Sequence, residues 1–449
     1  MIIMSVFVNR LGELSALNTV FSSKRAELIL LYGRRRVGKS TLLIKSLSER
    51  KDALYLLGDS SKSVLDNLSR QVKDSFVRFA SWDDFFQFLL ESKYKIIVID
   101  EFQYLFKADK SWPSVFQRWW EKFKETDKKI VLSGSLISTI YKITKGYGSA
   151  LYGRHTKELR IFPLEYYYLP QFFKGFSKED CLKVFFMLGG VPRYFEEFDD
   201  SKSLDENILD KLLDKNSFLY NEPMNLLFEE FRDVSPYVSI MQSITFGSMT
   251  FTDISQRAGV SNNKLPKYLS VLERVGLVSK ELIVSDKRIK SKNTRYVLND
   301  NFFYFWFRFV FVKKQLLEQG LNKEVFSSIK TDLNSFFGFS FEQVCKQFLI
   351  KNRFFSFTSL GRYWKGEEEI DVVALNEEKK EVLFCECKWQ DNVNAEEILK
   401  DLSRKSILFD WKQSSRKDEF AVFAKTFSRK ISSFEGKKVH CFEIKNLFN

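Results

Sequence analysis

The chain has few of the residues that bind structural metals or cross-link small secreted domains. In 449 residues there are five cysteines and two histidines. Cys385 and Cys387 alternate with charged residues, as in a strand, so we expect reduced thiols in a core. No metal-ligand spacing links the full set, which is Cys181, Cys345, Cys385, Cys387, Cys441, His155 and His440.

A long apolar run and a recognisable targeting segment are also lacking. The N-terminus shows no basic region followed by an apolar core and a cleavage site. The longest aromatic run, FFYFWFRFVFV at 302–312, is too short to span a bilayer and contains Arg308. We expect this run to form a buried helix in a cytoplasmic protein that has no membrane partner.

The composition describes a globular protein with excess positive charge. Hydrophobic residues make up 44% and charged residues 29%, and the length predicts two to four domains. The net charge of +13 favours a polyanionic partner such as DNA, although a lysine-rich surface is the alternative explanation.

Residues 27–43, ELILLYGRRRVGKSTLL, contain a phosphate-binding loop. An apolar strand runs into G-x-x-x-x-G-K-S and then into the apolar start of a helix. Gly33 and Gly38 allow the backbone N–H groups to face phosphates, Lys39 faces the β- and γ-phosphates, and Ser40 provides a hydroxyl for Mg²⁺. The predicted ATP-binding residues are Gly33, Arg34, Arg35, Arg36, Val37, Gly38, Lys39, Ser40 and Thr41.

Two further strands complete the predicted nucleotide site. YKIIVIDEFQYL at 94–105 ends in Asp100, expected in the Mg²⁺ shell, and Glu101, expected to polarise the attacking water. The segment KKIVLSGS at 128–135 ends in small hydroxylated residues. Either Ser133 or Ser135 contacts the γ-phosphate, or the segment is a simple turn. The order of these strands and helices predicts an α/β domain with a doubly wound sheet. We expect this domain to hydrolyse ATP to ADP and phosphate.

At this point the chain resembles the archaeal-type ATPases, relatives of the AAA+ and STAND NTPases. The shared segments are FVNRLGEL, GRRRVGKS, VIDEFQYL, SALYGR at 149–154 and GGVPRYFE at 189–196. The resemblance implies that Arg154 faces the phosphates and that Pro192 marks a contact between a lid and the nucleotide. A homo-oligomer is also open.

The middle of the chain predicts a helical lid at 166–235 and a winged helix-turn-helix at 236–300. The segment 250–284 reads as two helices and a turn, followed by a hairpin with a basic tip. One interpretation is a DNA-binding module; the other is an interdomain spacer, because Pro266 in the first turns of the second helix is unusual. The expected DNA contacts are Asn262, Asn263, Lys264, Lys267, Lys287, Arg288 and Lys290.

The C-terminal segments EEEIDVVALN at 367–376 and EVLFCECKW at 381–389 carry charges inside apolar strands. Because side chains alternate along a strand, Glu386 and Lys388 share one face, and Asp371 lies beside them on the hairpin partner. Two carboxylates and a lysine are what metal-dependent phosphodiester cleavage requires.

The pattern E-I-D…E-C-K resembles the PD-(D/E)xK signature of restriction-endonuclease-like domains. The resemblance implies a catalytic set of Asp371, Glu386 and Lys388, and Mg²⁺ or Mn²⁺ bound by Asp371, Glu386 and Glu342. An inactive relic with a structural Glu–Lys pair is the alternative. The predicted domains are 1–165 (ATPase), 166–235 (lid), 236–300 (winged helix), 301–330 (helical connector) and 331–449 (nuclease-like).

The sequence therefore predicts an ATP-hydrolysing protein that acts on nucleic acid and carries a C-terminal nuclease. The runner-up is an ATP-dependent DNA-binding or signalling switch that does not cut. A purely structural interaction module is a third hypothesis, which the intact phosphate loop disfavours.

Overall fold

The computed structural model describes residues 7–72, 77–145, 149–286 and 293–448. The chain divides into two compact units. The first comprises Met1–Leu164, Val191–Glu196 and Leu226–Arg232. The second comprises Glu165–Gly190, Glu197–Asn225 and Asp233–Asn449. Two segments from the predicted lid region thus belong to the first unit.

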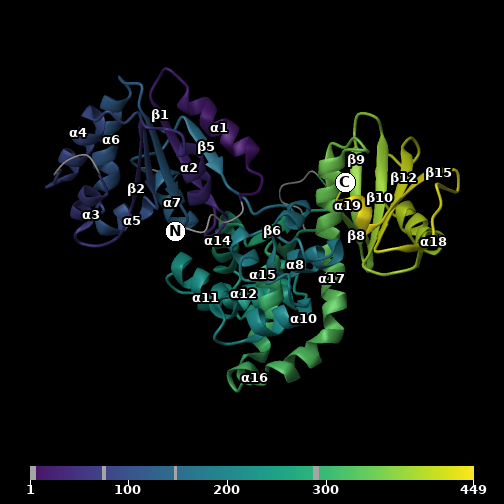
Figure 1. Ribbon diagram of the computed structural model, residues 1–449. Helices are drawn as coiled ribbons and strands as arrows, with labels where there is room; N and C mark the ends of the chain where they lie inside the picture. The colour runs from purple at the N-terminus through teal and green to yellow at the C-terminus, as the bar shows by residue number, and fades with distance from the viewer. Residues whose placement is uncertain (1–6, 73–76, 146–148, 287–292, 449) are drawn as a thin grey trace. The chain divides into compact units, whose positions relative to one another are not determined.

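The first unit is built on a parallel sheet of five strands in the order β2-β3-β4-β1-β5 (Figure 1). Strands β1, β3 and β4 are buried along their whole length, as expected where helices cover both faces. The strands are β1 Glu27–Tyr32, β2 Ala53–Leu57, β3 Ile96–Asp100, β4 Lys129–Gly134 and β5 Lys157–Arg160. The helices are α1 Leu11–Phe21, α2 Lys39–Leu47, α3 Val64–Gln71, α4 Trp82–Glu91, α5 Gln103–Ala108, α6 Trp112–Phe123, α7 Ile137–Thr144 and α9 Pro192–Phe195.

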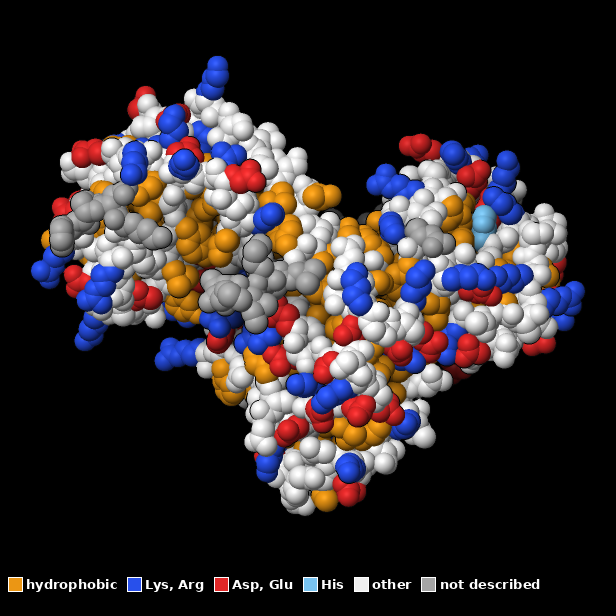
Figure 2. Space-filling model, viewed as in Figure 1, with side chains coloured by type: hydrophobic (Ala, Val, Ile, Leu, Met, Phe, Trp, Pro, Cys, Tyr) orange, Lys and Arg blue, Asp and Glu red, His pale blue; other side chains and the backbone are white. Residues whose placement is uncertain are grey.

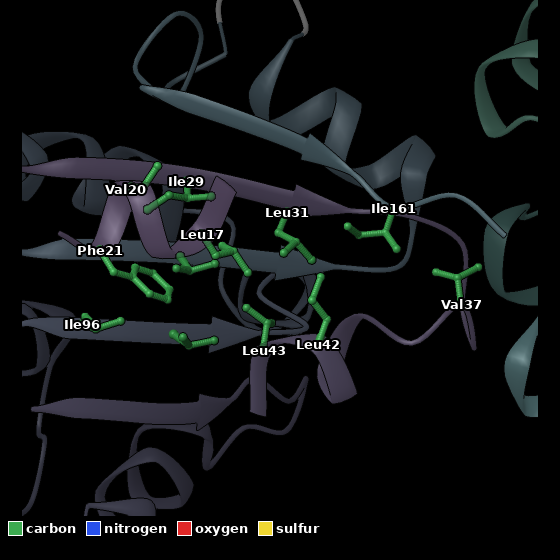
Figure 3. Close-up of a cluster of buried hydrophobic side chains, with 12 residues drawn as sticks. Leu17, Val20, Phe21, Ile29, Leu31, Val37, Leu42, Leu43, Ile96 and Ile161 are labelled. Carbon is green, nitrogen blue, oxygen red and sulfur yellow. The ribbon is translucent and has the colours of Figure 1, made fainter. Parts of the chain in front are cut away.

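Apolar side chains from strands and helices fix the sheet beneath the phosphate loop. Ile29 and Leu31 of β1 lie against Leu17 of α1 and Leu42 of α2, and all four are inaccessible to solvent (Figure 3). Val37 of the loop itself belongs to this cluster (Figure 3). The core therefore holds the loop at the carboxyl edge of the sheet, where the ends of β1, β3 and β4 meet.

The second unit begins with a largely helical part. Its first helical segments are η1 Tyr166–Gln171, α8 Lys178–Leu188, α10 Leu204–Asn207, η2 Ile208–Leu213, α11 Phe218–Glu230 and α12 Ser235–Thr245, and α11 ends within the first unit. The aromatic run at 302–312 forms the buried helix that the sequence predicts, in three short pieces: α15 Asn301–Phe305, η3 Trp306–Val310 and η4 Phe311–Lys313. Among the described residues, we find no helix with the length and apolar character needed to cross a membrane.

Residues 250–286 and 293–298 form two helices followed by a pair of antiparallel strands. The helices are α13 Phe251–Ala258 and α14 Leu265–Val275, and the strands are β6 Val278–Glu281 and β7 Arg295–Leu298. Pro266 lies in the first turn of α14, where its missing N–H removes no helical hydrogen bond. The proline is therefore compatible with this helix.

The C-terminal sheet has six strands in the order β14-β15-β12-β10-β9-β8. They are β8 Ser359–Lys365, β9 Glu368–Asn376, β10 Glu381–Lys388, β12 Lys417–Ala424, β14 Ser433–Phe434 and β15 Lys437–Phe442, with a separate pair β11 Val393–Asn394 and β13 Phe427–Arg429. The helices are α16 Lys314–Glu318, α17 Asn322–Asn352, α18 Ala395–Ile407 and α19 Ile444–Leu447.

Helix α17 differs from the predicted boundary, because it runs without interruption through residues 330 and 331. Its second half packs on β9 and β10 (Figure 1). The sequence also gave no indication of β8, the edge strand beside β9.

Candidate functional site

The phosphate loop has the backbone that close approach to phosphates requires. A Cβ on Gly33 would lie 2.3 Å from the carbonyl oxygen of Ile161, and Gly38 has a φ of 94° with open space around it. Arg34 accepts a hydrogen bond at 2.9 Å from the Nζ of Lys39 through its carbonyl oxygen. Arg36 has a φ of 69°, and Thr41 is exposed. These features fit the binding of a nucleoside triphosphate at the start of α2.

Lys39 is 4% exposed beside the acidic end of β3. Burial lowers the pKa of Lys39 to about 8, while the carboxylates of Glu101 and Asp100 oppose that change. Phosphate groups at the loop would act in the same direction as these carboxylates and favour the charged ammonium.

Asp100 is fully buried and accepts hydrogen bonds from three donors. Its Oδ2 accepts from Ser40 Oγ at 2.6 Å and from Tyr55 hydroxyl at 2.5 Å, and its Oδ1 accepts from the Glu101 N–H at 3.0 Å. Ser40 and Asp100, the two predicted Mg²⁺ ligands, are therefore already in contact. Hydroxyl and carboxylate oxygens are ligands that Mg²⁺ prefers, so the pair fits this ion. No local pattern in the sequence pointed to Tyr55.

Glu101 is held at the end of β3 with a φ of 53°. Its Oε2 accepts a hydrogen bond from Ser135 Oγ at 2.7 Å and another from Gln103 Nε2. Of the two serines considered after β4, Ser135 is the one that contacts an acidic residue of the site. Ser133 is completely buried and has no side-chain hydrogen bond to another described residue.

The end of α11 contributes two adjacent carboxylates to the first unit, although it lies far along the chain from the loop. Arg35 Nη1 donates to Glu229 Oε1 at 2.6 Å, and Arg35 Nη2 donates to the Tyr104 hydroxyl. Glu230 Oε1 accepts from the Ser138 N–H at 2.6 Å. Neither carboxylate has a sequence signature, because the contact depends on where the chain returns after residue 225.

Arg10 and Pro192 also belong to the first unit. Arg10 Nη2 donates to the carbonyl oxygens of Val37 at 3.0 Å and Phe162 at 2.6 Å, which ties the N-terminal segment to the loop. Pro192 begins α9 within the same unit.

Arg154 is not near the phosphate loop of its own chain, contrary to the predicted placement. It precedes β5 at the amino edge of the sheet, where the Thr156 N–H donates to Leu28 O at 2.8 Å. Its Nε lies 3.6 Å from Glu121 Oε1. Because β1 separates this edge from Gly33, Arg154 and the loop occupy opposite ends of the strand.

The second acidic cluster lies on β9 and β10. Lys388 Nζ donates to Glu386 Oε1 at 2.7 Å, so the two charges share one face as the alternation predicts. Asp371 Oδ2 accepts from the Cys387 N–H at 2.8 Å. The Nζ of Lys405, on α18, lies 3.9 Å from Glu386 Oε1. No local sequence pattern connected Lys405 with this strand.

Electrostatics in this cluster favour a bound cation. Burial and the facing charge of Glu386 raise the pKa of Asp371 to about 6. Burial alone would lower the pKa of Lys388, but Glu386 raises it above its ordinary value. Glu386 is 6% exposed, and its Oε2 has no hydrogen-bond partner among the described residues. An unsatisfied buried carboxylate oxygen beside a second carboxylate fits a divalent ion.

Glu342 is engaged elsewhere. Its Oε2 accepts a hydrogen bond from Arg362 Nη2 of β8, and Arg362 Nη1 donates to Glu369 Oε1 at 2.6 Å. Burial raises the pKa of Glu342, and the Arg362 guanidinium opposes that rise. Within the described ranges no three His, Cys, Asp or Glu side chains are grouped closely enough to hold a metal, so Glu342 is not placed as a third ligand.

The predicted DNA contacts at the start of α14 are exposed; they are Asn262, Asn263, Lys264 and Lys267. Lys287, Arg288 and Lys290, predicted on the basic tip of the hairpin, lie outside the described residues.

The parallel sheet, the phosphate loop and the Ser40–Asp100 pair define a P-loop ATPase domain. Residues 7–198 match the family described as an ATPase domain predominantly from Archaea. Residues 306–399 match a family described as archaeal and bacterial proteins of unknown function. The predicted ATPase family is therefore confirmed, and the C-terminal match names no activity.

Among known proteins, the chain is 34% identical over 452 residues to the uncharacterized protein MJECL04 of Methanocaldococcus jannaschii, covering 98% of this chain and 100% of that protein. The chain belongs to the same family. A 46-residue stretch is 50% identical to the uncharacterized ATP-binding protein MJ0423 of the same organism, covering 10% of this chain and 78% of that protein.

A solved structure gives the same fold for the ATPase part. The Walker-type ATPase PABY2304 of Pyrococcus abyssi matches with a TM-score of 0.50 and 20% identity, covering 67% of this chain and 96% of that one.

Proposed function

We propose that this ATPase acts on nucleic acid and cleaves phosphodiester bonds at its C-terminal sheet. ATP turnover would use Lys39 to hold phosphates, Ser40 and Asp100 to hold Mg²⁺, and Glu101 to orient the attacking water. Cleavage would use Asp371, Glu386 and Lys388 with Mg²⁺ or Mn²⁺.

One observation carries the cleavage proposal: Glu386 Oε2 is buried beside Asp371 and has no hydrogen-bond partner in the described part of the chain, while Lys388 donates to the other oxygen of Glu386. Burying an unsatisfied carboxylate oxygen costs free energy, so its retention is best explained by a ligand. A divalent cation bound there supplies Lewis acidity toward a phosphodiester and its attacking water. Lys388 would remain close to that water or to the developing negative charge.

We further propose that the exposed start of α14 contacts nucleic acid. Asn262, Asn263, Lys264 and Lys267 lie together at the beginning of a helix, where side chains of a helix-turn-helix reach DNA. On the face shown in Figure 2, basic side chains are interspersed with acidic ones, so the positive charge is not concentrated in one patch of this face. The proposal depends on these local residues rather than on the overall charge.

Cleavage is tested with the full-length protein, Mn²⁺, and plasmid and single-stranded DNA as substrates. We expect Asp371→Asn to abolish cleavage and leave ATP turnover unchanged, because Asp371 belongs to the second unit. Asp332→Asn, an exposed aspartate on α17, is the matched control. Cleavage that persists at the wild-type rate in Asp371→Asn would exclude this site.

The alternative function is an ATP-dependent DNA-binding or signalling switch without cleavage. Its support is the pairing of Glu342 with Arg362, which leaves only two carboxylates for a metal. DNA binding that depends on ATP, measured by fluorescence anisotropy, with no cut in any substrate would favour the switch.

A further inference from the structure

Arg362 lies within the acidic cluster of the C-terminal sheet and is 7% exposed. Its two terminal nitrogens donate to carboxylates from two elements, Glu342 of α17 and Glu369 of β9. Glu369 also accepts a hydrogen bond at 2.8 Å from Arg295 of β7, which fixes it from the other side. The guanidinium is thus a built part of the cluster rather than a surface charge.

The backbone of Arg362 is fixed as well. The Val284 N–H donates to Arg362 O at 3.1 Å, and Ile283 forms a bridge with the same residue. Arg362 therefore has hydrogen bonds on its main chain and on its side chain. Movement of the guanidinium away from Glu342 would require several of these contacts to break together.

The charge of Arg362 is permanent. Burial alone would lower its pKa, but the carboxylates of Glu342 and Glu369 raise it above the ordinary arginine value. Removing Glu342 from this guanidinium would leave the buried cation with Glu369 as its one remaining ion-paired carboxylate among the described residues, and breaking half of a buried ion-pair network is unfavourable. A metal ion that took Glu342 as a ligand would have to separate Glu342 from Arg362. It would also lie close to the positive charge of the Arg362 guanidinium.

We propose that the C-terminal carboxylate site binds a single divalent cation through Asp371 and Glu386, while Arg362 neutralises Glu342 in place of a second cation. This stoichiometry presupposes the metal-dependent cleavage proposed above. The chemical class of the ligand is a hard, oxygen-preferring cation such as Mg²⁺ or Mn²⁺.

The experiment counts bound ions without measuring activity. Full-length protein free of nucleotide is titrated with MnCl₂, and free Mn²⁺ is measured by electron paramagnetic resonance. The difference between wild type and Asp371→Asn gives the ions that require Asp371, and it removes any binding at Ser40 and Asp100 from the count. We expect a difference of one ion per chain.

Two variants test the place of Arg362. Glu342→Gln should leave the Asp371-dependent ion bound with little change in affinity. Arg362→Gln should add an ion, and the double variant Arg362→Gln/Glu342→Gln should remove that ion again. Circular dichroism checks that each variant folds, and Glu342→Gln alone decides the question if Arg362→Gln does not fold.

The opposing outcomes are separate for the two proposals. Two Asp371-dependent ions in wild type, or loss of the Asp371-dependent ion in Glu342→Gln, would make Glu342 a ligand and overturn the single-ion site. No Asp371-dependent ion in wild type would overturn the metal site on which the cleavage function depends.

Discussion

Asp100 at the end of β3 and Glu386 in β10 are both buried carboxylates, 0% and 6% exposed, yet their surroundings differ. Three donors of the chain satisfy Asp100. Glu386 has one oxygen bonded to Lys388 and the other without a described partner, and it faces a second carboxylate. In the ATP site, both carboxylate oxygens of Asp100 thus accept hydrogen bonds from the protein. In the C-terminal site, one carboxylate oxygen of Glu386 accepts none from the described residues and can accept a ligand.

The two proposed metal sites should therefore depend on nucleotide to different extents. At Asp100 an arriving Mg²⁺ replaces or joins hydrogen bonds that already exist, so metal affinity there should depend strongly on nucleotide phosphates, which add ligands. At Asp371 and Glu386 a bound ion would relieve repulsion between two carboxylates, so its binding should not need nucleotide.

The largest expected effect separates the two sites by activity. Lys39→Ala should lower ATP turnover by about 100-fold or more, the loss typical of a group that stabilises transition-state charge. Mn²⁺-dependent cleavage in the absence of ATP should persist, because Lys39 belongs to the first unit. Phosphate release and plasmid nicking measure the two activities, with Lys45→Ala on the exposed face of α2 as control. ATP turnover that survives in Lys39→Ala would show that the loop is not the hydrolytic site.

A smaller effect tests whether internal donors position Asp100. Tyr55→Phe removes the 2.5 Å hydrogen bond to Asp100 Oδ2 and keeps the ring. One hydrogen bond contributes about 1 kcal/mol, so ATP turnover should fall about fivefold. Tyr152→Phe, an exposed tyrosine of the same unit, should turn over ATP like wild type. Equal rates in Tyr55→Phe and wild type would show that Ser40 and the Glu101 N–H suffice.

A still smaller change concerns Arg35, whose side chain is 28% exposed and pairs with Glu229. Because Glu229 competes with phosphates for this guanidinium, Glu229→Gln should bind ATP more tightly. An ion pair at this exposure contributes about 0.5 kcal/mol, which corresponds to about a two- to threefold change in Kd. Isothermal titration with a non-hydrolysable ATP analogue measures it, and Glu91→Gln on α4 is the exposed control. Weaker binding in Glu229→Gln would mean that Glu229 positions Arg35 instead of competing for it.

Local patterns predicted the parts of the chain whose chemistry is contained in short segments. The phosphate loop needs only a strand, glycines and a helix start, and the alternation in β10 placed Glu386 beside Lys388 correctly. The partners that came from distant segments were not predictable in this way. Glu229 reaches Arg35 only because residues 226–232 rejoin the first unit, and Glu342 pairs with Arg362 because β8 adds an edge strand. Arg154 was misplaced because a motif gives no information on which edge of the sheet it occupies.

The smallest effect concerns Glu230, a half-buried carboxylate of the first unit that accepts hydrogen bonds from the N–H and hydroxyl of Ser138. Burial raises its pKa, while the hydroxyl and N–H of Ser138 oppose the rise. The folded state therefore binds this proton more tightly than the unfolded chain. Wild type should lose stability relative to Glu230→Gln as pH rises above the ordinary glutamate pKa of about 4.3, and the difference should level off above the raised value.

Urea unfolding of both proteins between about pH 4 and about pH 8 measures this difference, which we expect to stay below about 1 kcal/mol because Ser138 compensates the ionised form. Glu49→Gln, on an exposed carboxylate of the first unit, shows what ordinary surface titration contributes. A difference that is independent of pH would mean that Glu230 titrates as it does in the unfolded chain. A raised pKa caused by burial and a facing carboxylate would then distinguish Asp371 from Glu230.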